Sequence, residues 1–168
     1  MPAPKGTLSN VETGETVEFQ FNPVTIKIAL GAEWKSSASP GASFERLQFA
    51  NRKNDVITYK LQMDGRSVGA PSVPDRLAYL ASLMTPPDAD LDIRTASPPR
   101  VLFRFPGFIS VETILPKLTI DVKRFDLVTG APDYVDIDVE LIEFRTKRLG
   151  SQTVRRLGFI RVAAGQSA

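Results

Sequence analysis

The sequence contains neither cysteine nor histidine in its 168 residues. Without cysteine the chain has no disulfides, thiolate metal sites or thiol nucleophiles, and without histidine it lacks the commonest general base and metal ligand. Carboxylate and Ser–Lys enzymes need neither residue, but most other catalysis is excluded. We therefore expect a protein that is not an enzyme, with no catalytic residue, metal or cofactor, and with a role in binding or assembly.

Long hydrophobic runs are also missing, because uninterrupted apolar stretches are only a few residues long. A transmembrane helix needs about 20 mostly apolar residues, so we expect no membrane span. Residues 1–6 lack the apolar stretch of a secretory signal. We therefore expect synthesis and assembly in the cytoplasm.

Acidic residues are missing from the C-terminal part of the chain, although the net charge of the whole chain is only +2. The basic residues there are Arg145, Lys147, Arg148, Arg155, Arg156 and Arg161. Such a patch suits nucleic acid, an anionic lipid surface or an acidic protein face. A base-stacking platform needs interleaved aromatic residues, and this stretch has only Phe159. We therefore expect a protein neighbour and no nucleic acid.

Apolar and polar residues alternate in several short segments, which is the pattern of half-buried β-strands. These segments are 17–21, 24–30, 55–64, 101–105, 109–115, 118–125 and 134–145. Asn22-Pro23 separates the first two and predicts a bend, since proline lacks the donor that a central strand requires. Residues 35–43 have no periodicity and predict a mobile surface loop.

A single helix is predicted after Ser72, which can act as the N-cap, with Pro74 in the first turn and Thr85-Pro86-Pro87 at its end. Leu77, Leu80, Ala81 and Met84 recur at helical spacing and predict one apolar stripe. The fold class is thus mainly β: two packed antiparallel sheets or a partly open barrel, with one α-helix. We expect an N-terminal extension at 1–14, a β domain at 15–145 and a basic C-terminal arm at 146–168.

The last strand carries the acidic row Asp136, Asp138 and Glu140 on one face. Neighbouring carboxylates on that face lie about 6 to 7 Å apart, a spacing also found in inverting glycosidases. We favour a solvated or lumen-facing strand, because no aromatic cluster flanks the row to desolvate a carboxyl group. Ile142 and Phe144 then make the same strand apolar on both faces, which predicts cover by a neighbouring subunit.

Trp34 is the only tryptophan and precedes the small-residue segment 35–43. A place in the core is the default for this residue, and the alternative is an exposed anchor at an interface.

Five segments in this order resemble the tube domain of contractile injection systems. They are Val-Glu-Phe-Gln-Phe-Asn-Pro at 17–23, Leu-Gln-Met-Asp-Gly-Arg at 61–66, the helix at 74–84, Pro-Pro-Arg-Val-Leu-Phe-Arg-Phe-Pro-Gly at 98–107, and Arg-Phe-Asp-Leu-Val-Thr-Gly-Ala-Pro at 124–132 before the strand that ends in Glu143-Phe144. The resemblance spans about residues 15–145. It implies a phage-tail-tube-like fold of two sheets and a helix.

The resemblance further implies a structural subunit that forms a hexameric ring with copies of itself, in the baseplate of a bacterial phage-tail-like particle that is released or membrane-anchored. The ring would be a tube initiator, or tube adaptor, that connects the spike or hub protein to the inner tube protein. Relatives carry a LysM module after the tube domain, whereas a basic arm stands here.

The residues that we expect at subunit interfaces are either charged or apolar without cover from their own chain. They are Trp34, Asp136, Asp138, Glu140, Ile142, Phe144, Arg145, Lys147, Arg148, Arg155 and Arg156. Two rival interpretations remain open: a monomeric β-sandwich that binds carbohydrate or protein through Trp34, and a carboxylate glycosidase that uses Asp136 and Asp138.

Overall fold

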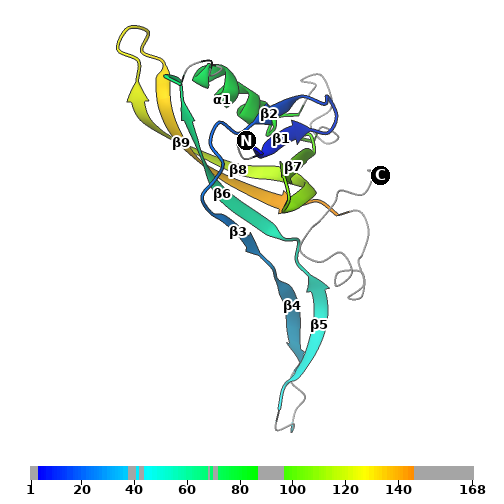
Figure 1. Ribbon diagram of the computed structural model, residues 1–168. Helices are drawn as coiled ribbons and strands as arrows, with labels where there is room; N and C mark the ends of the chain where they lie inside the picture. The colour runs from blue at the N-terminus through cyan, green and yellow to red at the C-terminus, as the bar shows by residue number, and fades with distance from the viewer. Residues whose placement is uncertain are drawn as a thin grey trace.

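The computed structural model describes residues 4–37, 41, 44–67, 69, 72–86 and 97–145. Within these residues the chain is mainly β, with one helix (Figure 1). The strands are β1 (Thr7–Asn10), β2 (Thr16–Glu18), β3 (Ile26–Ala29), β4 (Ala32–Ser37), β5 (Arg46–Arg52), β6 (Val56–Asp64), β7 (Val101–Phe105), β8 (Ile109–Phe125) and β9 (Pro132–Glu143). The helix α1 (Val73–Ser82) lies between β6 and β7 in the chain.

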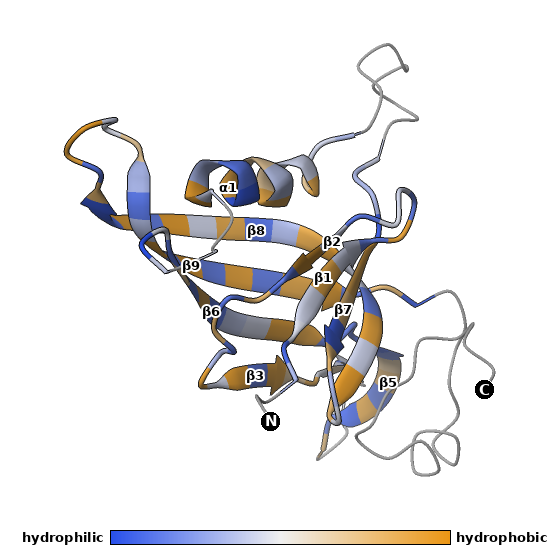
Figure 2. Ribbon diagram, turned by 45° about the horizontal axis from the view of Figure 1, so that its top comes forward, coloured by the Kyte–Doolittle hydropathy of each residue, from blue (hydrophilic) through white to orange (hydrophobic). Residues whose placement is uncertain are grey.

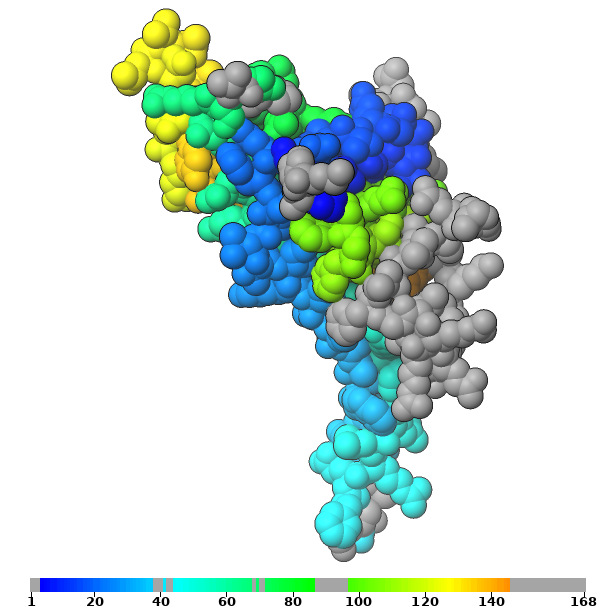
Figure 3. Space-filling model, in the orientation of Figure 1, coloured from blue at the N-terminus to red at the C-terminus, as the bar shows by residue number. Residues whose placement is uncertain are grey.

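The strands form two antiparallel sheets, as the sequence predicted, and the described strands do not close into a barrel. The main sheet has seven strands in the order β2-β1-β7-β8-β9-β6-β3. The second sheet is the hairpin β4–β5, which extends away from the body of the molecule (Figures 1 and 3). Lys35, Ser36 and Ser37 belong to β4, so the prediction of a loop beginning at residue 35 is wrong for these residues.

The core lies on one face of the main sheet, because buried apolar and polar residues alternate along the central strands (Figure 2). In β6, Ile57, Tyr59, Leu61 and Met63 are buried, as their spacing predicted. The ring of Tyr59 stacks on Phe103 with centroids 5.0 Å apart. Apolar burial of this kind contributes most of the stability of a small domain, so this aromatic contact lies at the centre of the fold.

Helix α1 covers part of the core face through Val73 and Leu80, with Leu83 buried immediately after it. Pro74 occupies the first turn as expected, but the Ser72 side chain makes no capping hydrogen bond. Ala81 is exposed, so its place in the predicted stripe was wrong. In the described part of the chain, no helix is long and apolar enough to cross a membrane.

Strand β8 is a single strand of 17 residues, where the sequence predicted two. Its pairing with β9 shifts between Ile114 and Lys117, so that one extra residue is accommodated beside Pro116. Proline is tolerated at such a bulge because it has no N–H to donate to the ladder. The extra residue moves the core-facing positions from odd numbers, ending at Leu115, to even numbers, beginning at Leu118.

Part of the predicted N-terminal extension belongs to the main sheet. Strand β1 pairs with both β2 and β7, and Leu8 is fully buried. The Tyr79 hydroxyl of α1 donates to the Glu15 carbonyl oxygen at 2.7 Å, which joins the helix to the segment between β1 and β2. The predicted basic arm at 146–168 lies outside the described residues.

Removal of a central aromatic ring should test this account of the core. We expect Phe103→Ala to lower the free energy of unfolding by about 3–5 kcal/mol, because the lost contacts leave a cavity. The control is Leu127→Ala, at a side chain that is 98% exposed, which should change it by less than about 0.5 kcal/mol. Urea denaturation followed by circular dichroism measures both; equal effects of the two variants would contradict the assignment.

Candidate assembly surfaces

The acidic row Asp136, Asp138 and Glu140 lies on the face of the main sheet opposite the core. Gln62 donates to Asp136 Oδ1 at 3.3 Å, and Lys60 Nζ lies 3.7 Å from Asp138 Oδ1. The two carboxylates therefore belong to the polar surface of the sheet, as favoured from the sequence.

The same polar face carries a fourth acidic residue directly beside the row. Asp121 of β8 is the cross-strand partner of Asp136, and like charges in such a position are destabilising. Lys123 contacts Asp121, and this hydrogen bond, with the negative charges of Asp121, Asp136 and Asp138, raises the pKa of the lysine. The surface here favours an additional cation.

An open groove of about 420 Å³ runs across this polar face. Its lining is of mixed charge and includes Lys27, Lys60, Lys117, Thr119, Asp138 and Glu140. No group of three or more acidic residues among the described residues is arranged to hold a metal ion. A mixed polar surface of this kind suits a solvent-filled lumen or a polar contact.

A second surface is the free edge of β8. Strand β7 pairs only with residues 109–113 of β8, whereas β9 follows β8 from Thr113 to Phe125. No strand of the described residues pairs with residues 114–125 on the side away from β9. Exposed peptide groups along a strand edge are a template for pairing with another chain.

The free edge of β8 has apolar side chains on one face and polar side chains on the other. Leu118, Ile120 and Val122 lie on the core side, and Ile120 is 41% exposed there. Lys117, Thr119 and Asp121 alternate with them and are exposed on the polar side. The edge is therefore amphipathic from Lys117 to Val122.

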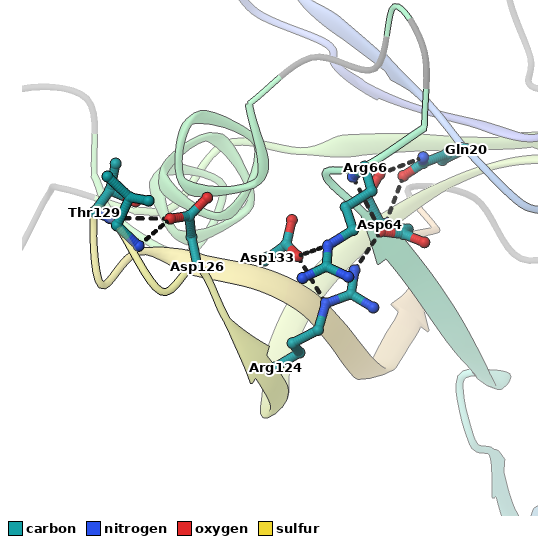
Figure 4. A network of polar contacts seen from close by, with 8 residues as sticks. Gln20, Asp64, Arg66, Arg124, Asp126, Thr129 and Asp133 are labelled. Atoms are coloured by element: carbon teal, nitrogen blue, oxygen red, sulfur yellow. Dashed lines mark hydrogen bonds and ion pairs between the residues drawn. The ribbon is translucent and has the colours of Figure 1, made fainter.

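Polar contacts hold the far end of this edge in place (Figure 4). Arg124 near the end of β8 donates to Asp133 at 2.7 Å and to Asp64 at 2.8 Å. The hydrogen bond to Asp133 is the main cause of the raised pKa of Arg124. In the adjoining turn, backbone N–H groups of Thr129 and Val128 donate to Asp126 and lower its pKa.

The third surface is the hairpin β4–β5, whose described residues are all exposed. The ring of Trp34 meets that of Phe49 edge-on with centroids 5.5 Å apart. Leu47 lies opposite Ser36 on the same face, while Lys35 and Arg46 occupy the other face. The hairpin is thus amphipathic and its apolar face is uncovered by any described residue.

Trp34 is 58% exposed, so the default expectation that it anchors the core was wrong. The hairpin partners Leu47 and Phe49 were missed in the sequence. Their alternation with Arg46 and Gln48 is a signal for a strand, but no element was predicted between residues 43 and 55.

The root of the hairpin is held by charged groups around the buried carboxylate of Asp55. This residue is completely buried, and both Arg52 and Arg145 donate to it at 3.3 Å. Arg145 also lies 2.7 Å from Glu143, and this hydrogen bond is the main cause of its raised pKa. The cluster joins the end of β5 to the end of β9, so it fixes where the hairpin leaves the body.

Two more of the predicted interface residues, Ile142 and Phe144, lie near this root. Ile142 is half-buried on the polar face of the sheet, in a cross-strand row with Val56 and Ile114. Phe144 is 39% exposed, with the Arg100 guanidinium 5.6 Å from its ring centroid. Lys147, Arg148, Arg155 and Arg156 lie outside the described residues.

Comparison with models of protein families matches residues 4–151 to the contractile injection system tube protein family. A search of curated proteins finds no match. The matched range includes every strand of the main sheet, the helix and the hairpin.

Replacement of one arginine at the hairpin root should destabilise the chain. We expect Arg145→Met to lower the free energy of unfolding by about 1–3 kcal/mol, because buried Asp55 loses a charged partner. The matched control, Lys60→Met, removes an ion pair that is more than half exposed on both sides, and should cost less than about 1 kcal/mol. Urea denaturation compares them, and a smaller effect for Arg145→Met than for the control would contradict the structural role of the cluster.

Proposed function

The chain belongs to the contractile injection system tube protein family, and we propose that it acts there as a tube initiator or adaptor. In this proposal copies of the chain form a hexameric ring that connects the spike or hub protein to the inner tube protein. Polymerisation of the tube begins on this ring.

The free edge of β8 is the observation that carries the proposal. Among the described residues no strand pairs with residues 114–125 on the side away from β9, and such an edge invites pairing with a neighbouring chain. When such contacts are made head to tail around a rotation axis, the ring closes and no further copy can add within it. This gives a defined number of subunits, which is the property that an initiating ring needs.

The acidic row on the polar face supports the same proposal. Asp121 and Asp136 face each other across two strands, and Asp138 lies on the same face of β9. In a ring, these residues line the lumen or meet a basic surface of a neighbour. We propose the second contact for the basic arm, which follows Arg145 and carries Lys147, Arg148, Arg155 and Arg156.

Partners of the ring follow from this position in the particle. The two faces of the ring would contact the hub on one side and the inner tube protein on the other, with other baseplate subunits around it. The absence of histidine and cysteine agrees with a structural role, since the proposed work consists of binding and positioning.

Deletion of the gene should separate tube initiation from spike assembly. We expect particles that retain the spike but lack inner tubes when imaged by electron microscopy, because the tube protein has no ring on which to begin. Expression of the intact chain in the deletion strain is the control and should restore the tubes. Tubes of normal length and number in the deletion strain would contradict the proposed function, as would a chain that stays monomeric with its hub and binds oligosaccharides.

Charge reversal in the basic arm should test its docking on an acidic neighbour. We expect Arg155→Glu with Arg156→Glu to reduce the fraction of assembled rings by about tenfold at moderate salt, because two attractive contacts become repulsive. The matched control is Lys53→Glu with Arg104→Glu, which makes the same charge change at two exposed residues. Mass photometry measures the assembled fraction, and unchanged assembly of the arm variant would exclude docking.

A further inference from the structure

We propose that the hairpin β4–β5 of one subunit pairs with the free edge of β8 in the next copy of this chain. The inference rests on the proposed ring and specifies which surfaces meet in it. The hairpin would add its strands to the main sheet of its neighbour, so that peptide groups along residues 114–125 gain partners from the neighbouring chain.

The free edge of β8 is long enough to pair with either hairpin strand, and the two segments agree in the arrangement of their side chains. The free part of β8 spans residues 114–125, and the hairpin strands have six and seven residues. Both are amphipathic with a period of two. When they pair, the apolar face of the hairpin lies on the same side of the sheet as Leu118, Ile120 and Val122.

This side-by-side arrangement would cover apolar surface that one copy leaves exposed. Trp34 is 58% exposed, Phe49 57% and Leu47 67% in the hairpin. Ile120, at 41% exposed, lies beside the free edge on the core side of the neighbouring sheet. Burial of aromatic and branched side chains against each other supplies about 25 cal/mol per Å² of apolar area, which favours a stable contact.

Charge on the opposite face fits the same alignment. Lys35 and Arg46 lie on the polar face of the hairpin. The polar face beside the free edge carries Asp121, with Asp136 as its cross-strand partner. Two cations from the hairpin would add to the contact that Lys123 makes with Asp121 within a single chain, and would further offset the repulsion between these carboxylates.

The contact has to be made between different copies, because the two surfaces lie at different ends of the molecule. The hairpin extends from the lower end of the body in Figure 1, whereas the β8–β9 turn lies at the upper end. Arg52, Asp55 and Arg145 fix the root of the hairpin, so it is held away from its own β8. Each copy would bind one neighbour through its hairpin and the other neighbour through its β8 edge. This is a head-to-tail contact, which a ring requires.

Cysteine crosslinking tests the contact without interference, because the chain has no cysteine of its own. Gln48→Cys places a thiol on the polar face of the hairpin, and Thr119→Cys places one on the polar face of the β8 edge. We expect a short bis-maleimide to link the two between subunits of rings assembled on the hub, giving a ladder of linked chains on a denaturing gel. The matched control pairs Gln48→Cys with Lys27→Cys, on the edge strand β3, and should give no ladder.

A second variant tests the apolar side of the same contact. Ile120→Lys places a charge where Trp34 and Phe49 of the neighbour would lie, and should lower the assembled fraction in mass photometry about tenfold. The control, Val24→Lys, changes an apolar residue that is fully exposed and should leave assembly unchanged.

The outcomes separate this inference from the proposed function. Rings that form but give no ladder of linked chains from Gln48→Cys with Thr119→Cys would overturn the hairpin contact and leave the ring intact. Rings that link through Lys27→Cys would do the same. Rings unaffected by Ile120→Lys would also overturn it. Failure of the intact chain to form any ring with its hub would overturn both proposals.

Discussion

The pairing of β9 with β8 on one side and β6 on the other is the interaction on which the rest of the structure depends. It aligns the buried residues of three strands on one face, where they meet the helix and the aromatic cluster around Phe103. The same alignment brings all the intervening polar residues to the opposite face. These two ladders of peptide hydrogen bonds thus define the interior of the subunit and the surface that it presents to others.

The main sheet is incomplete in a specific way. Strand β8 pairs with β7 along residues 109–113 and with β9 along residues 113–125, so among the described strands residues 114–125 have no partner on the side away from β9, while the hairpin forms a sheet of only two strands. A closed ring satisfies both conditions together, since each copy provides one element and accepts the other. The ionic contacts at the hairpin root then affect the geometry of the ring, because they hold the direction of the hairpin and this direction determines the angle between neighbouring copies.

Much of the fold could be read from alternation in the sequence. The period of two along β6 and β9 specified which residues are buried, and the resemblance to tube domains agreed with the family match. The Trp34 hairpin could not be read in the same way, because its apolar face is covered by no described residue and so contradicts the usual link between hydrophobic residues and a core. The contact between Asp55 and Arg145 could not be predicted from the sequence either, since residues 90 positions apart meet only once the sheet has formed.

The bulge at Pro116 limits how this chain can change in length. It exchanges the core-facing positions from odd to even numbers within one continuous strand. Loss of one residue at Pro116 would restore a regular ladder without changing the partners of Lys117 and the residues after it, so Asp121 would stay on the acidic face and Ile120 on the core side. A one-residue deletion elsewhere in the strand would turn the residues on one side of it to the other face of the sheet, so gene variants should change in length at the bulge and keep the rest of this segment fixed even where its composition differs.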